Sequence, residues 1–188
     1  MTKISVFIDG GNFFDGLHAQ GFSIDLDYRR LMASLADTEE ENIGDIFFYI
    51  APYPEGPYPN KCAAQESYYQ LLNDQGITVV RGTTEIRGGI FIERNVEAAL
   101  ATDLVAGAWR NIFDEALLVS RRAAFAPAVE AAKQAGRNIK TAFFNYNIDP
   151  TNGLKQVASS LRTIQSKDII GCTRSGPIPT GVHSAEDA

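Results

Sequence analysis

An acid and an amide directly follow the first apolar run of the chain. Residues 6–8 are Val, Phe and Ile, and they lead through Asp9 and two glycines to Asn12. The carboxyl end of a strand in an open α/β sheet faces the crevice where ligands bind. Asp9 could hold Mg²⁺ or Mn²⁺, which would activate water at a phosphoryl centre, or it could cap a helix that begins near Asn12. The sequence leaves both interpretations open.

Further acids that could join Asp9 lie later in the chain. Glu93 and Glu97 are four residues apart and can share one helical face, with Asp15 as a weaker candidate. Asp103 follows Glu97 by six residues, about 240° around a helix, so one straight helix cannot direct both at one point. Asp103 also lies on an apolar stripe with Val96, Leu100 and Gly107, so it faces the interior and needs a partner there. Either Glu97 acts from the first turn, or one of the two is a surface or capping acid.

A second apolar run ends in arginines instead of carboxylates. Residues 117–120 read Leu-Leu-Val-Ser, and Arg121, Arg122, Ala123, Ala124 and Phe125 follow. A metal site at this position would need acids, and arginine stays protonated at cellular pH. The two arginines either face the crevice or are ordinary surface charges.

Strand and helix patterns alternate along the chain, as in a mostly parallel sheet with helices on both faces. We predict a Rossmann-like α/β domain over residues 1–170 and a surface tail over 171–188. A proline-rich loop spans residues 52–59, and a β-hairpin around Gly88 and Gly89 spans 83–92. The predicted strands are 4–9, 45–51, 77–81, 115–120 and 139–144, and the predicted helices are 12–20, 27–36, 60–75, 96–110 and 127–135.

Composition narrows the classes of protein. The 188 residues carry a formal charge of −6, which does not suit non-specific coating of nucleic acid, so any such contact must use a local basic patch. We expect no membrane-spanning run and no secretion signal, since residues 1–4 enter a strand at once. Cys62 and Cys172 are too few for a disulfide framework. These features predict a cytoplasmic protein.

Three motifs, in order, resemble the NYN domain, LabA-like branch, of the PIN-like metal-dependent ribonucleases. They are residues 6–14, residues 96–104, which contain Ala-Thr-Asp, and residues 118–127. The resemblance implies a PIN-like three-layer fold, Mg²⁺ or Mn²⁺ held at the sheet edge, and hydrolysis of RNA. It assigns catalytic positions to Asp9, Asn12, Glu97 and Asp103, and metal ligation to the three acids of this set.

The chain departs from the family pattern at two places. Where the family usually reads Lys-Gly-Val-Asp, residues 94–97 read Arg-Asn-Val-Glu, which keeps an acid with a longer side chain, and the third motif also differs. Where the family usually reads Ser-Gly-Asp-Ser-Asp-Phe, residues 120–125 place Arg122 and Ala124 at the two acidic positions. A guanidinium there repels a cation and can instead pair with Asp9 or Asp103. We therefore expect weak or absent hydrolysis.

Three functional classes remain open. The first is a degenerate nuclease that binds RNA, single-stranded by expectation, or a nucleotide, through the hairpin and through Arg94, Ser120, Arg121 and Arg122. The second is an active Mg²⁺- or Mn²⁺-dependent ribonuclease using Asp9, Glu97 and Asp103. The third is a protein-interaction module, in which the loop at 52–59 and the hairpin hold a partner protein or a second copy of the chain.

Overall fold

A six-stranded parallel sheet forms the centre of the protein in the computed structural model, which describes residues 2–144 and 153–174. The strand order is β3-β2-β1-β6-β7-β8, so β1 lies in the middle. All carboxyl ends therefore meet at one edge. The strands are β1 (Ile4–Asp9), β2 (Ile43–Ile50), β3 (Ile77–Arg81), β6 (Glu115–Val119), β7 (Asn138–Phe144) and β8 (Ser160–Ile164).

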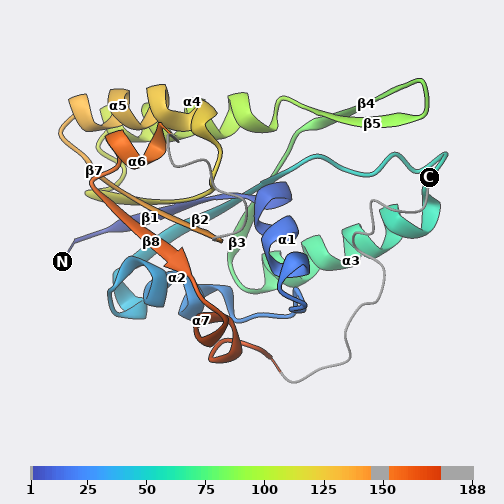
Figure 1. Ribbon diagram of the computed structural model, residues 1–188, viewed down its shortest axis with the longest axis horizontal. Coiled ribbons are helices and arrows are strands. Elements are labelled where there is room, and N and C mark those ends of the chain that lie inside the picture. Colours follow the sequence, from blue (N-terminus) through green and yellow to red (C-terminus); the bar gives the residue numbers. More distant parts are fainter. Residues whose placement is uncertain (1, 145–152, 175–188) are drawn as a thin grey trace.

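Helices cover both faces of this sheet (Figure 1). One layer contains α1 (Gly10–Ala19), α2 (Tyr28–Ala36), α3 (Pro59–Asp74) and α7 (Ser166–Ile170). The other contains α4 (Val96–Trp109), α5 (Ala126–Gln134) and α6 (Leu154–Val157). There are also two short 3₁₀ turns in the described residues. They are η1 (Glu40–Asn42), which follows α2, and η2 (Ala123–Phe125), which follows β6. No helix in the described part of the chain is long and apolar enough to cross a bilayer.

The alternation of β1 determines which face receives the acid at its end. Val6 and Ile8 pack in the core beneath α1, α2 and α3, whereas Phe7 packs in the core beneath α4 and α5. Asp9 is two residues beyond Phe7 and so points to the α4 side. Ile8 pairs with Val119 of β6, which places Ser120 next to Asp9 at the same edge.

The predicted hairpin forms a separate two-stranded sheet that projects from the body (Figure 1). It consists of β4 (Thr83–Arg87) and β5 (Ile90–Arg94), joined by Gly88 and Gly89 at φ 59° and 82°. Residues with a side chain rarely adopt such positive φ values, which accounts for the two glycines. The hydroxyl of Thr84 donates to the carbonyl of Pro52, so the hairpin is attached to the proline-rich loop.

The fold class and the five predicted strands are confirmed, with end shifts of one or two residues. The sixth strand, β8, was not predicted, and neither were α6 and α7. In β8 only Ile164 is buried, and this short edge strand lacks the apolar run that marks its neighbours. The start of the predicted tail is also corrected, because Cys172 is buried and Thr173 bridges to Leu26. Residues 175–188 of that tail lie outside the described residues.

The contact between α1 and β7 gives a direct test of the packing. A Cβ on Gly16 would lie 2.0 Å from Cδ2 of the buried Phe144 ring. We expect Gly16→Ala to lower the free energy of unfolding by about 1 kcal/mol, because overpacking costs about 1–3 kcal/mol and the gain in helix propensity of about 1 kcal/mol offsets part of it. Urea unfolding measures this change. Gly56→Ala is the matched control, since nothing lies within 4 Å of that position. Equal stability of the two variants would contradict this packing.

Candidate functional site

Asp9 is a buried carboxylate that accepts three polar contacts at the end of β1. Its side chain is 1% exposed. Oδ1 accepts the backbone N–H of Asn12 at 3.3 Å, which makes Asp9 the N-cap of α1. Oδ2 accepts the hydroxyl of Ser120 at 2.8 Å and lies 3.1 Å from Nε of Arg122. The capping interpretation is thus confirmed, and the same carboxylate also belongs to an ion pair.

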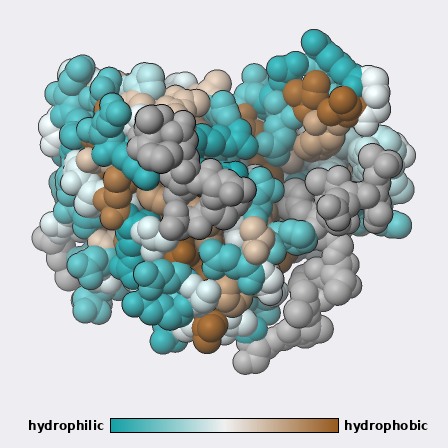
Figure 2. Space-filling model, in the orientation of Figure 1, coloured by the Kyte–Doolittle hydropathy of each residue, from teal (hydrophilic) through white to brown (hydrophobic). Residues whose placement is uncertain are grey.

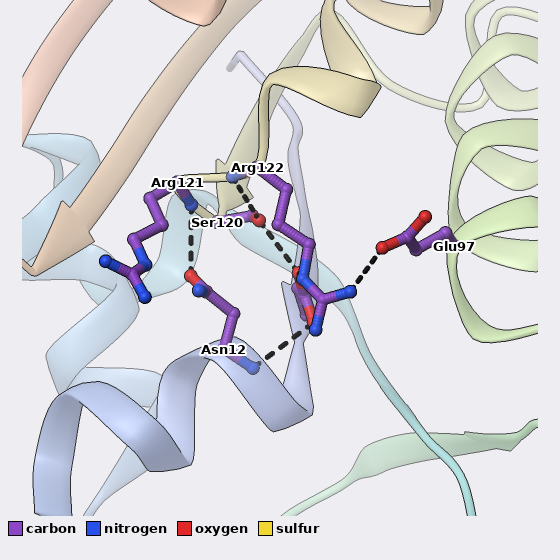
Figure 3. Close-up of polar contacts among 6 residues, drawn as sticks. Asn12, Glu97, Ser120, Arg121 and Arg122 are labelled. Carbon is purple, nitrogen blue, oxygen red and sulfur yellow. Dashed lines mark hydrogen bonds and ion pairs between the residues drawn. The ribbon is translucent and has the colours of Figure 1, made fainter. Parts of the chain in front are cut away.

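Arg122 lies between two carboxylates from different elements (Figure 3). Nε pairs with Asp9, and Nη1 donates to Oε1 of Glu97 in the first turn of α4. The backbone N–H of Arg122 donates to Oγ of Ser120 at 3.1 Å. The prediction that this guanidinium reaches Asp9 is confirmed. One cation therefore joins β1, the loop after β6 and the start of α4.

Asn12 fixes the loop that carries Arg122. Its Oδ1 accepts the backbone N–H of Arg121 at 3.0 Å, and its side chain is buried (Figure 3). The Arg121 side chain extends from the loop away from that of Arg122 (Figure 3). Asn12 and Ser120 thus hold the two consecutive loop residues from opposite sides. Ser120 is 1% exposed and its hydroxyl donates to Asp9. This hydroxyl is therefore not available for the predicted contact with RNA.

Burial and the ion pair act against each other on Asp9. Desolvation raises the pKa of Asp9 above its ordinary value, while Arg122, Ser120 and the Asn12 N–H lower it, and the net shift is upward. Removing the cation would therefore raise the pKa of Asp9 further.

Glu93 also belongs to this region, although the sequence offered it only as one acid among several. A Cβ on Gly11 would lie 3.3 Å from Oε2 of Glu93, so the carboxylate lies directly over the first turn of α1. Burial raises the pKa of Glu93, and Arg122 opposes this shift. The hairpin register could have identified it, since the pairs Thr84 with Glu93 and Ile86 with Phe91 share the face that meets the proline-rich loop.

Asp103 does not join this cluster, which corrects the predicted convergence. Its Oδ2 accepts the hydroxyl of Tyr49 at 3.0 Å, beside a separate cavity that Phe7 and Phe47 also line. Six residues of helix carry Asp103 about 9 Å from Glu97 along α4 and turn it to another direction. Asp103 is exposed, so the expectation that it faces the interior is wrong, and its carboxylate is instead the partner of the buried Tyr49 hydroxyl.

The residues present do not fit a divalent cation. A guanidinium occupies the space between Asp9 and Glu97, and its fixed charge repels a metal ion. Within residues 2–144 and 153–174, no group of three or more His, Cys, Asp or Glu side chains is arranged to hold one.

An open cavity of about 370 Å³ adjoins the ion pair. Its lining includes Arg122, Glu97, Glu93 and Arg94. Arg94 pairs with Glu85 at 3.0 Å, and both side chains are well exposed. Charged side chains of both signs therefore line the cavity beside Arg122, and Asp9 lies buried behind that guanidinium.

We expect Arg122→Ala to lower the free energy of unfolding by about 2 kcal/mol near pH 7. A fully buried pair broken on one side costs about 3–5 kcal/mol, and the 36% exposure of the Arg122 side chain reduces this. Because the pKa of Asp9 is raised in the folded state, the protonated carboxyl favours folding. This contribution to the free energy of unfolding is complete below the ordinary pKa of 3.8 and is lost as pH rises through the folded pKa. The variant raises that pKa further, so its deficit should grow from acid to neutral pH in urea titrations.

Two further variants test this account of the ion pair. Arg94→Ala removes a cation from an exposed pair and should change stability by less than about 0.5 kcal/mol. Adding Asp9→Asn to Arg122→Ala should restore most of the loss, since a neutral amide can still accept the Ser120 hydroxyl. A deficit for Arg122→Ala that is the same at every pH would count against a buried unpaired charge as its cause.

Residues 3–164 match the family model described as NYN domain. The crystal structure of a protein of unknown function from Vibrio parahaemolyticus has a similar fold, with a TM-score of 0.67. The two chains are 19% identical, and the similarity covers 89% of this chain and 95% of that one. None of the curated proteins matches this sequence.

Proposed function

The chain belongs to the NYN domain family of PIN-like nucleases, and from that premise we propose that it binds single-stranded RNA with little or no hydrolysis. The observation that carries this proposal is the position of Arg122 between Asp9 and Glu97. The narrower LabA-like assignment stays a prediction. Both cysteines are free thiols, which is consistent with the reducing cytoplasm that we propose as its location.

The ion pair supports binding without turnover. Hydrolysis of a phosphodiester by this class of enzyme needs a Lewis acid that activates water and stabilises charge on phosphorus. A guanidinium can neutralise charge and donate hydrogen bonds, but it does not lower the pKa of a bound water as a metal does. Arg122 also neutralises the buried Asp9 carboxylate, which would otherwise repel a phosphate at this edge of the sheet.

Two other arginines near the site provide candidate phosphate contacts. Arg121 follows Ser120 in the loop, and Arg94 lines the open cavity beside Arg122. Because the whole chain carries −6, affinity must come from this local group and must fall steeply with salt. Arg122 contacts two carboxylates and offsets part of their negative charge, so we do not count it among the phosphate contacts.

We expect a labelled oligouridine to bind the protein in fluorescence anisotropy titrations at low salt. Arg121→Ala and Arg94→Ala should each weaken binding several-fold and flatten the log–log salt slope by about 0.7, the value for one phosphate contact on a single strand. Arg110→Ala is the matched control, since it removes an exposed arginine at the opposite end of α4. If the control weakens binding as much as the two site variants, contact at this edge is ruled out.

The double variant Arg122→Asp with Ala124→Asp should gain Mn²⁺-dependent cleavage of single-stranded RNA. It replaces the fixed cation with a carboxylate and restores both acids that the family carries in this loop. Mn²⁺ should raise the melting temperature of the variant but not of the parent, because a ligand that binds only the folded state stabilises it. A folded double variant without cleavage, or a parent that cleaves RNA with Mn²⁺, would contradict the proposed loss of activity.

A further inference from the structure

Three aromatic rings form a cluster beside the hairpin, outside both hydrophobic cores. Tyr53 and Tyr58 come from the proline-rich loop after β2, and Phe91 comes from β5. The Tyr53 and Phe91 centroids lie 5.1 Å apart with planes at 35°, and the Tyr53 and Tyr58 centroids lie 6.0 Å apart with planes at 70°. All three side chains are partly exposed, so the cluster contributes to the surface. We call these three residues the aromatic cluster.

A lysine lies over two of the rings. Nζ of Lys61 is 5.7 Å from the Tyr53 centroid and 5.5 Å from the Tyr58 centroid, within the range of cation–π contacts. Flat ring faces next to a positive charge are the combination with which proteins hold single-stranded nucleic acid, because bases stack on the rings and the cation attracts the phosphates.

The cluster is held in place by buried contacts. The backbone N–H of Tyr53 donates to Oε1 of Gln65 at 2.7 Å, and Nε2 of Gln65 donates to the carbonyl of Ala51 at 3.2 Å. Gln65 is 1% exposed, so this anchor belongs to the body of the protein. The carbonyl of Pro52, the residue before Tyr53, accepts the Thr84 hydroxyl, which attaches the loop to the hairpin. Prolines limit the loop further, and a ligand therefore meets ring faces that are already ordered.

The cluster adjoins the ion-pair site. Phe91 and Glu93 are two residues apart on one face of β5, a separation of about 7 Å. Glu93 lies over Gly11 and is close enough to Arg122 and Tyr53 to interact with both electrostatically. A strand whose phosphate reaches Arg121 or Arg94 thus has aromatic faces nearby for its bases.

We propose that the aromatic cluster is a base-stacking platform for single-stranded RNA and that Lys61 contacts the phosphate backbone beside it. This inference rests on the proposed RNA-binding function. A protein partner is less favoured at this place, because Lys61 puts a positive charge over two of the rings, whereas the most exposed apolar side chain of the hairpin, Ile90, lies next to its turn, where Figure 2 shows an apolar patch.

The test compares two labelled oligomers of equal length, one of uridines and one of abasic sites, in anisotropy titrations. The abasic oligomer keeps its phosphates but has no bases to stack. We expect the parent protein to prefer the uridine oligomer roughly tenfold, and Tyr53→Leu and Phe91→Leu to lose most of that preference. Tyr53→Phe keeps the ring and should retain it. Lys61→Gln should instead flatten the salt slope and leave the preference in place.

Trp109→Leu is the matched control, since Trp109 is 62% exposed and ends α4 on the body of the protein. Thermal melts establish that each variant is folded, and Tyr58→Leu gives a second way to change the platform if Tyr53→Leu does not fold. If the parent binds RNA and the cluster variants keep its base preference, the platform is refuted while the proposed function stands. If the parent binds neither oligomer, the proposed function fails and the platform fails with it. If the cluster variants dissociate a dimer of the free protein, the rings are an interface between copies and the inference is overturned.

Discussion

A carboxylate buried at the end of a central strand must have a partner of opposite charge, and this requirement organises one edge of the protein. Asp9 is enclosed by β1, the first turn of α1 and the loop after β6, so its charge is poorly solvated. Arg122 provides the partner from that loop, and Glu97 at the start of α4 shares it. One guanidinium thus links β1, the loop after β6 and the start of α4.

Much of this arrangement could be predicted from the sequence, because it follows from strand ends. Asp9 and Ser120 each come directly after an apolar run, and parallel strands bring such positions to one edge. Asp103 was misplaced because its motif does not say which way it faces along α4, where it is exposed and accepts the hydroxyl of the buried Tyr49. The face of Glu93 follows from the hairpin turn, but the sequence does not show that this face of the hairpin lies over the first turn of α1. The residues of β8 are mostly polar or exposed, so the sequence shows no strand pattern there. The strand is recognised from its backbone pairing with β7.

The hairpin and the ion pair contribute different properties to the same edge of the sheet. The pair of Asp9 and Arg122 is held rigidly, because Asp9 accepts hydrogen bonds from the Asn12 backbone and the Ser120 hydroxyl, and Ser120 accepts the backbone N–H of Arg122. The hairpin brings Phe91 and Glu93 over the body from a separate small sheet, and it is joined to the proline-rich loop by Thr84 and Tyr53. Substitutions in the hairpin and the proline-rich loop can therefore change this surface without disturbing the buried Asp9 carboxylate beneath it.

The contact of Arg122 with both Asp9 and Glu97 also affects how such a chain can evolve. Replacing the arginine by a neutral residue leaves a buried carboxylate unpaired, and replacing it by an acid adds another negative charge beside Asp9, Glu93 and Glu97. Either single step is unfavourable until a metal ion binds well enough to offset it. Each single-residue intermediate between this ion pair and a metal site would thus be less stable than both ends. Selection for stability alone is therefore enough to keep the guanidinium in place, because its replacement needs more than one residue to change together.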